Sequence, residues 1–197
     1  MSENEDKHNH GHSFNPENWR KLESDERRAR MDPAKLIQAM ALAPDSTVID
    51  IGVGTGFFAV EAAPLCGKFI GVDHSPRMLE IFRSKEAFTT FGNVELLEGK
   101  AESLPVDDGV ADVVFHVNLF HEVADMEKFH QQIRRALKPG GRLYMADWKA
   151  IPTEGGPPAD HRISEQKALG ILQRDGFTNI GKLDLYEDHY VFSAISG

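Results

Sequence analysis

The sequence of 197 residues has one cysteine, no long hydrophobic run and a deficit of positive charge. The single Cys66 excludes an intramolecular disulfide and a multi-cysteine metal cluster, and it is compatible with a reducing compartment. The 22 Lys and Arg against 31 Asp and Glu give a formal charge of -9 at pH 7. Because nucleic acids and anionic membranes reward clustered basic residues, we expect neither as a partner and favour a small molecule.

No apolar run has the length of a membrane span, and the polar N-terminus lacks the apolar segment of a secretory signal. These absences predict a cytoplasmic protein. The length suits one domain with a sizeable core, and the apolar fraction of 41% is ordinary for a globular chain. The sequence leaves the oligomeric state open.

Residues 1–13 are polar and without periodicity, so we expect them to be mobile without a ligand. His8, His10 and His12 alternate, and an extended chain would place them on one side, as a weak divalent-metal site requires. Three histidines without a fourth ligand are more often incidental. We therefore predict no metal site.

The most informative stretch is residues 47–58, Thr-Val-Ile-Asp-Ile-Gly-Val-Gly-Thr-Gly-Phe-Phe. A β-branched run leads into three alternating glycines, after which the apolar spacing becomes helical, which predicts a strand, a tight turn and a helix. Gly52, Gly54 and Gly56 remove Cβ atoms and permit positive φ, so a ligand can lie against the backbone.

The spacing of these glycines bears on which ligand binds. The dinucleotide fingerprint is G-x-G-x-x-G, whereas the register here is G-x-G-x-G. Asp50, just before the turn, would repel a pyrophosphate but suits an ammonium or a sulfonium. Its alternative role is to cap local backbone amides, since a buried carboxylate without a partner is costly.

This stretch resembles motif I of the class I S-adenosylmethionine-dependent methyltransferases, and the resemblance covers Asp50, Gly52, Gly54 and Gly56. It is closest to the small-molecule branch that includes quinone-biosynthesis and arsenite methyltransferases, although a single cysteine suits arsenite chemistry poorly. The family implies an α/β fold with a doubly wound, mostly parallel seven-stranded sheet and an antiparallel C-terminal hairpin. It also implies S-adenosyl-L-methionine as the cofactor.

Asp73 ends a predicted second strand, residues 68–73, and stands 17 residues after Gly56. An acid at this position can accept both hydroxyl hydrogens of a ribose. It could instead cap the next helix, but Ser75-Pro76 already supplies a cap and a first-turn proline. We include His74 and Met78 among the cofactor contacts; Met78 could equally be a core residue.

Two further segments resemble family motifs. Residues 99–105, Gly-Lys-Ala-Glu-Ser-Leu-Pro, resemble a Gly-Asp-Ala-Glu-x-Leu-Pro segment that contacts adenine, although Lys100 replaces the aspartate. The resemblance therefore implies Ala101 and Glu102 as cofactor contacts. Asn118 ends a predicted fourth strand, residues 111–118, and is the candidate contact to the methionine portion.

His121 follows in a Leu-Phe-His-Glu stretch that the family places near the methyl group, and it is the predicted catalytic base. A packed, purely structural histidine is the alternative, and His116 or His161 could also serve. Residues 149–163 are rich in proline and glycine. This segment is either a wall of the substrate pocket, with His161 and Arg162 as contacts, or a solvated linker.

Two helices are predicted before the first strand, one from Asn15-Pro16 to about Arg30 and one from Asp32-Pro33 to about Leu42. The mixed charges of the first predict a largely solvated element, and Phe14 and Trp19 are candidates for a lid over the cofactor. We therefore divide the chain into a tail with a lid helix, residues 1–31, and a methyltransferase domain, residues 32–197.

The predicted function is in-line transfer of the sulfonium methyl to a small-molecule acceptor. A non-catalytic S-adenosylmethionine-binding regulatory or scaffold module is the alternative, because such a module needs the same cofactor residues. A nicotinamide-dependent oxidoreductase is a third interpretation.

Overall fold

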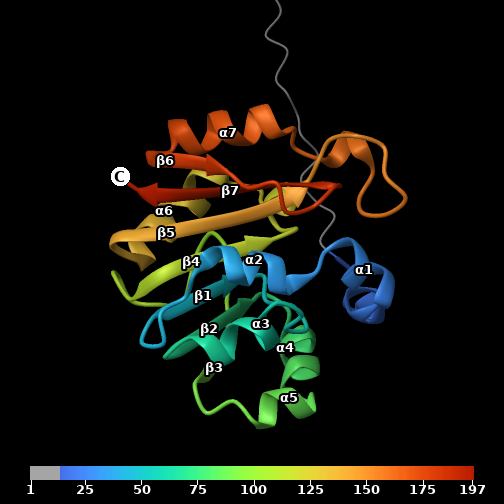
Figure 1. Ribbon diagram of the computed structural model, residues 1–197, viewed down its shortest axis with the longest axis vertical. Coiled ribbons are helices and arrows are strands. Elements are labelled where there is room, and N and C mark those ends of the chain that lie inside the picture. The colour runs from blue at the N-terminus through green and yellow to red at the C-terminus, as the bar shows by residue number, and fades with distance from the viewer. Residues whose placement is uncertain (1–13) are drawn as a thin grey trace, which may run out of the picture.

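The computed structural model describes residues 14–197, so the histidines of the predicted tail, His8, His10 and His12, lie outside the described residues. One seven-stranded sheet in the order β3-β2-β1-β4-β5-β7-β6 runs through the molecule, with helices on both faces (Figure 1). The strands are β1 (Thr47–Ile51), β2 (Lys68–Asp73), β3 (Val94–Glu98), β4 (Ala111–Val117), β5 (Leu137–Trp148), β6 (Phe177–Lys182) and β7 (His189–Ser196).

The first five strands are parallel, and β7 pairs antiparallel with both β5 and β6. Only β7 is therefore reversed, and β6 runs with the parallel strands. The predicted fold class, a doubly wound sheet with an antiparallel C-terminal hairpin, is confirmed. Strand order changes direction between β1 and β4, which is where open α/β sheets bind ligands, outside the carboxyl ends of the strands.

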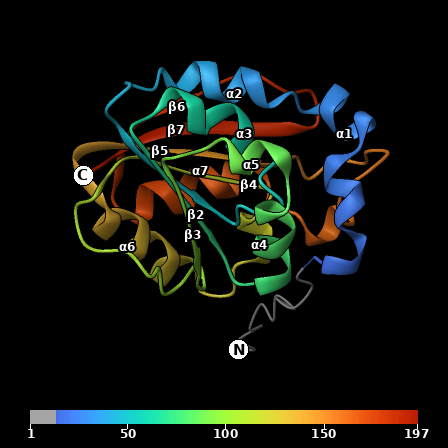
Figure 2. The same cartoon turned by 90° about the horizontal axis from the view of Figure 1, so that it is seen from below.

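Each face of the sheet carries its own hydrophobic core. Helices cover both faces (Figure 2). One face is covered by α2 (Pro33–Met40), α3 (Ala59–Ala62) and α4 (Pro76–Arg83), and the other by α6 (Met126–Ala136) and α7 (Glu165–Arg174). The central strands alternate between the two: Val48 packs on the first face and Ile49 on the second, both fully buried. The short elements are η2 (Ala63–Leu65), α5 (Glu86–Thr89), η3 (Phe120–Glu122) and η4 (Ala159–His161).

The predicted single helix from Asn15 to Arg30 is wrong in its continuity. The structure has a 3₁₀ helix, η1 (Pro16–Glu23), and then α1 (Asp25–Arg30). Ser24 separates them: its backbone is extended, with φ -71° and ψ 151°, and its hydroxyl accepts a hydrogen bond from the Arg27 amide. A serine cap thus starts a second helix where the charge pattern suggested one continuous element.

Strand β5 begins at Leu137 and contains a Lys-Pro-Gly-Gly segment near its start. Leu137 already pairs with Ala111, and the register then shifts before Val113 pairs with Arg142. The Lys-Pro-Gly-Gly segment is therefore an irregularity inside the strand, and Gly140, with φ 77°, makes the turn. Among residues 14–197 no helix is both long and apolar enough to cross a membrane.

Candidate functional site

A cavity of about 900 Å³ lies at the carboxyl ends of β1, β2, β4 and β5. In Figure 1 this is the side of the sheet on which η1 and α1 and the loop of residues 149–163 lie. Its walls come from the lid helices, the glycine turn, the ends of the strands and that loop. The lining residues used below are Phe14, Arg27, Arg30, Asp50, Gly52, Gly54, Asp73, His74, Met78, Asn118, His121, Glu122, Trp148, His161 and His189.

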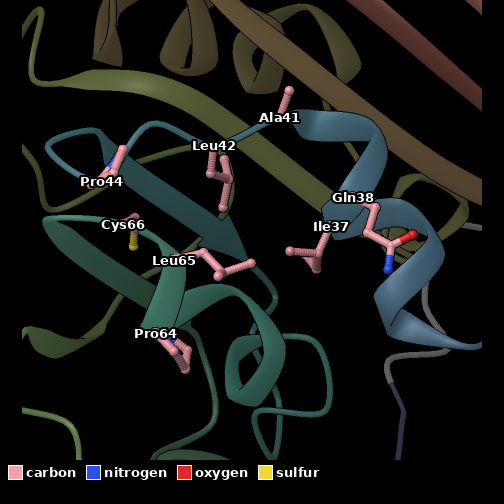
Figure 3. A pocket seen from close by; sticks show the side chains of 8 residues that line it. All are labelled: Ile37, Gln38, Ala41, Leu42, Pro44, Pro64, Leu65 and Cys66. Atoms are coloured by element: carbon pink, nitrogen blue, oxygen red, sulfur yellow. The ribbon is translucent and has the colours of Figure 1, made fainter.

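A second hollow, of about 370 Å³, lies between α2 and η2. Figure 3 shows its largely apolar wall, in which Ile37 and Leu65 lie across from each other and Cys66 is at one side. None of the predicted site residues lines it. The larger cavity is therefore the candidate site.

The three glycines of the turn have different structural roles. All have positive φ, at 77° for Gly52, 54° for Gly54 and 83° for Gly56. Gly52 and Gly54 line the cavity, but Gly56 does not. A Cβ on Gly56 would lie 2.4 Å from the ring of Phe82, so this glycine allows α4 to pack against the turn. Only the first two open the backbone to a ligand.

Asp73 ties the end of β2 to the glycine turn. Its Oδ2 accepts a hydrogen bond from the Gly54 amide at 2.8 Å, and its Oδ1 accepts one from the Ser75 amide at 2.9 Å. The helix cap is Ser75, whose hydroxyl accepts from the Met78 amide, so the alternative role of Asp73 as the cap is not realised. Its carboxylate faces the cavity with lone pairs left for a ribose. His74 lies beside it, with Nδ1 3.7 Å from Oδ1.

Asp50 is 3% exposed and, among the described residues, accepts no hydrogen bond that would make it a local cap. Burial raises the pKa of its carboxyl well above the ordinary value; the nearby Asp73 carboxylate adds to the rise and Arg27 opposes it. Asn118, at φ 54°, lines the same part of the cavity, and its Oδ1 is buried without a partner in the described part of the chain. Both groups are acceptors that lack a donor.

Arg27 lines the same cavity as Asp50, and the sequence pattern did not predict it as a site residue. Charge patterning placed it on a solvated helix, yet it lies in the cavity wall with its guanidinium 4.3 Å from the centre of the Phe57 ring. Burial lowers its pKa to about 10, and Glu23 and Asp50 oppose this, so the group stays charged at neutral pH. No residue of η1 or α1 is fully buried, as a solvated element requires.

The catalytic candidate His121 forms a pair with Asp147, which ends β5 and is 1% exposed at its side chain. The His121 Nδ1 lies 2.7 Å from Asp147 Oδ1, and the His121 amide donates to Oδ2 at 3.2 Å. A carboxylate accepts only, so Nδ1 carries the proton and Nε2 is left as the acceptor. Nε2 lies 3.8 Å from Glu122 Oε1.

This pairing sets the ionisation of His121. Burial by itself would lower the pKa of the imidazole, but the hydrogen bond and the charge of Asp147, with Glu122, outweigh it and raise the pKa above the ordinary value. The alternative His116 is fully buried, does not line the cavity, and has its pKa lowered to about 3 by burial. His161 does line the cavity.

Ala101 and Glu102 lie apart from the other predicted contacts, because neither lines the cavity. The Glu102 Oε1 accepts a hydrogen bond from the Ala124 amide at 3.3 Å, which ties it to the segment before α6. Met78 does line the cavity and is also 4% exposed, so it serves the wall and the core together.

Arg162, expected as a substrate contact, instead organises its own loop. Its guanidinium donates to the carbonyls of Lys149, Ile151, Gly155 and Pro157 and to the Thr153 hydroxyl, at 2.8 to 3.1 Å. The prediction that residues 149–163 form a wall of the pocket is supported by Gly155, Gly156, Pro157 and Pro158, which line it. A solvated linker would not be held by five hydrogen bonds from one buried side chain.

Trp148 and His189 form an aromatic part of the wall, with ring centroids 4.1 Å apart. Burial lowers the pKa of His189 to about 3, so this ring is neutral. The position of Trp148 at the carboxyl end of its strand predicts that it lies beside the site, whereas His189 carries no such signal. The pairing of β5 with β7 brings the two residues together.

The segment of η1 and α1 is held to the glycine turn by hydrogen-bond and ionic contacts. The Thr55 hydroxyl donates to Glu23 Oε1, and the Lys85 ammonium lies 2.7 Å from the same carboxylate. Phe14 lines the cavity, whereas Trp19 does not and instead stacks with Arg20 at 4.8 Å.

The sheet is parallel except for one reversed strand, and its glycine turn lies between the buried carboxylates of Asp50 and Asp73. This combination is typical of the fold of the S-adenosylmethionine-dependent methyltransferases. Comparison with known proteins agrees. A family model described as a methyltransferase domain matches residues 49–145. Residues 49–145 therefore carry a methyltransferase domain, and both the predicted class, an S-adenosylmethionine-dependent methyltransferase, and its cofactor, S-adenosylmethionine, are confirmed.

Named relatives and solved structures are consistent with that class. A demethylmenaquinone methyltransferase of Chlorobaculum tepidum is 41% identical over 105 residues, covering 51% of this chain and 40% of that protein. An arsenite methyltransferase of Halobacterium salinarum is 34% identical over 110 residues, covering 54% and 28%. A crystal structure of a SAM-dependent methyltransferase from Aquifex aeolicus superposes with a TM-score of 0.87 at 27% identity, covering 94% of this chain and all of that one. The chain spans less than half the length of these two curated relatives.

Proposed function

We propose that this chain transfers the methyl group of S-adenosylmethionine to a small-molecule acceptor that loses a proton to His121. The observation that carries the proposal is one cavity of about 900 Å³ that joins the glycine turn and its two acids to a histidine paired with a carboxylate. Binding groups and a candidate base thus face the same space.

The residues present fit the cofactor. Asp73 offers its carboxylate to the ribose, and Met78 offers an apolar surface beside it. Asp50 and the unpartnered Asn118 Oδ1 offer acceptors to the ammonium of the amino-acid end. When bound, S-adenosylmethionine supplies an electrophilic methyl group on a sulfonium.

The chain's own contribution is orientation and proton removal. Holding an attacking atom about 3 Å from the methyl carbon and in line with the breaking bond can supply on the order of 7–11 kcal/mol. Asp147 holds the imidazole so that Nε2 can take the acceptor's proton as the nucleophile attacks. The resulting imidazolium is stabilised by the same carboxylate.

The wall opposite the glycine turn indicates the kind of acceptor. Trp148 and His189 present neutral rings, and Pro157 and Pro158 add apolar surface. This wall suits a small aromatic or otherwise flat compound with a weakly acidic O–H or C–H. A relative named as a demethylmenaquinone methyltransferase is consistent with this class. Arsenite suits the site less well, because the only thiol, Cys66, is buried outside the cavity.

Turnover is tested by S-adenosylhomocysteine formation with panels of phenols and hydroquinones, of amines, and of arsenite with thiols. We expect product with the hydroxylated aromatics. The His121→Ala variant should bind S-adenosylmethionine normally but lose turnover. Binding of the cofactor without product from any panel would contradict the proposal and support a non-catalytic binding module.

We also propose that the chain divides into a tail with a lid helix, residues 1–31, and a methyltransferase domain, residues 32–197, in which η1 and α1 act as the lid. Support comes from Arg27 and Phe14 in the cavity wall and from the contacts of Glu23 with Thr55 and Lys85.

A further inference from the structure

We infer that Arg27, on the lid helix α1, binds the carboxylate of the cofactor's amino-acid end, so that the lid closes on the whole cofactor rather than on its nucleoside alone. This inference rests on the proposed function, because it assumes S-adenosylmethionine in the cavity.

The first argument is that the guanidinium has unused donors. In the described part of the chain one of its five N–H groups makes a hydrogen bond, from Nη1 to the Leu22 carbonyl at 2.7 Å. Within residues 14–197 no carboxylate oxygen lies within 4.0 Å of it; Glu23 and Asp50 act on it at longer range, and its Cζ lies 4.3 Å from the centre of the Phe57 ring. A partly buried guanidinium with free donors facing a cavity matches the two oxygens of a carboxylate.

The second argument is the charge pattern around it. Asp50 and the Asn118 Oδ1 line the same cavity and lack donors among the described residues. One cation beside two acceptors is complementary to a zwitterion, which carries one carboxylate and one ammonium. The amino-acid end of the cofactor has this pair of charges, whereas its nucleoside end has neither.

The third argument concerns the other arginines of the lid. Lys21 also lines the cavity, but its ammonium lacks the two-pronged geometry that matches a carboxylate. Arg30 also lines the cavity, but its Nε lies 3.5 Å from Asp188 and its guanidinium faces Trp148 at 5.8 Å. Arg28 pairs with Glu61 at 3.5 Å and does not line the cavity. Arg27 is thus the lid arginine that faces the cavity without an ionic partner in the described structure.

The test compares two probes by calorimetry on the full chain. S-adenosylhomocysteine carries the amino-acid end, and 5′-methylthioadenosine has the same nucleoside and thioether without it. We expect Arg27→Met to weaken S-adenosylhomocysteine about 10- to 100-fold and to change 5′-methylthioadenosine less than twofold. Arg27→Lys should fall between, because an ammonium keeps the charge but loses the two-pronged geometry.

Arg20→Met is the matched control, since Arg20 is a lid arginine that does not line the cavity, and it should leave both affinities unchanged. An equal loss for both probes in Arg27→Met would show a structural role in the lid and overturn the inference. An unchanged affinity of Arg27→Met for S-adenosylhomocysteine would also overturn the inference. If the unmodified protein binds neither probe, both the proposed function and the inference about Arg27 are wrong. If the unmodified protein binds both probes, the variants test the role of Arg27 alone.

Discussion

At the scale of single residues, the chemistry depends on which charges are buried and what they face. Asp147 is 1% exposed and lies against His121, and the pair joins an acid at the end of β5 to a histidine in η3. Glu122 lies on the other side of the ring. A base placed between two carboxylates gains a raised pKa, so it is neutral and competent only above that pKa.

The rate of methyl transfer should therefore rise with pH through the raised pKa of His121 and level off above it. Asp147→Asn removes the charge that raises this pKa, so the rising part of the profile should move to lower pH while the plateau falls. His121→Ala should lower kcat about 10²- to 10⁴-fold and abolish the rising part of the pH profile.

The measurement is kcat against pH from 5.5 to 9 at saturating cofactor. Cofactor affinity, measured in parallel, serves as the control and should stay within twofold in both variants. A profile of Asp147→Asn that coincides with that of the unmodified protein would exclude the pair as the source of the titration.

At the scale of elements, the glycine turn illustrates how one motif serves two purposes. Gly54 opens to the cavity and donates to Asp73, whereas Gly56 lies under the ring of Phe82. The turn therefore binds ligand on one side and receives α4 on the other. The spacing of the three glycines is therefore explained by packing against α4 as well as by ligand binding.

Gly56→Ala should destabilise the fold. At φ 83° an alanine is strained, and its Cβ would meet Phe82 at 2.4 Å, so we expect a loss of about 1–3 kcal/mol in the free energy of unfolding. Urea denaturation measures it. Gly92→Ala is the control, because no atom lies within 4 Å of its Cβ position. Equal stabilities of the two variants would show that α4 moves away at no cost.

At the scale of the whole molecule, the cavity is built from segments at opposite ends of the chain. The lid precedes β1, and the wall of Trp148 and His189 belongs to β5 and β7. The Tyr186 hydroxyl, just before β7, donates to the carbonyl of Asp32, just after the lid, at 2.8 Å. Because a ligand in the cavity contacts both the lid and the wall, it should stabilise the fold as one unit.

S-adenosylhomocysteine at 100 times its Kd should stabilise the native state by about 2.7 kcal/mol. For a chain of this length that corresponds to a rise in Tm of about 5 to 10 °C. Differential scanning calorimetry measures it, with adenosine at the same concentration as the weaker comparison. An unchanged Tm under conditions in which calorimetric titration shows saturation would mean that the ligand binds the unfolded chain as well.

The sequence alone determined the glycine turn, the strand before it and the two acids Asp50 and Asp73, because strand periodicity, turn residues and the positions of strand ends are local properties. The seven-stranded sheet followed from the resemblance to a known family. The sequence also singled out His121. Tertiary structure decided what these residues face: His121 meets a carboxylate 26 positions away, and Gly56 receives a phenyl ring from another helix.

The roles of the two arginines show the same division. By sequence Arg27 is one charge among many on a polar helix and Arg162 is a candidate substrate contact, but the fold turns the first toward the cavity and buries the second among carbonyl groups. A charged side chain is long enough to point toward solvent or toward the protein, and only the surrounding segments, distant in sequence, fix which of the two it does.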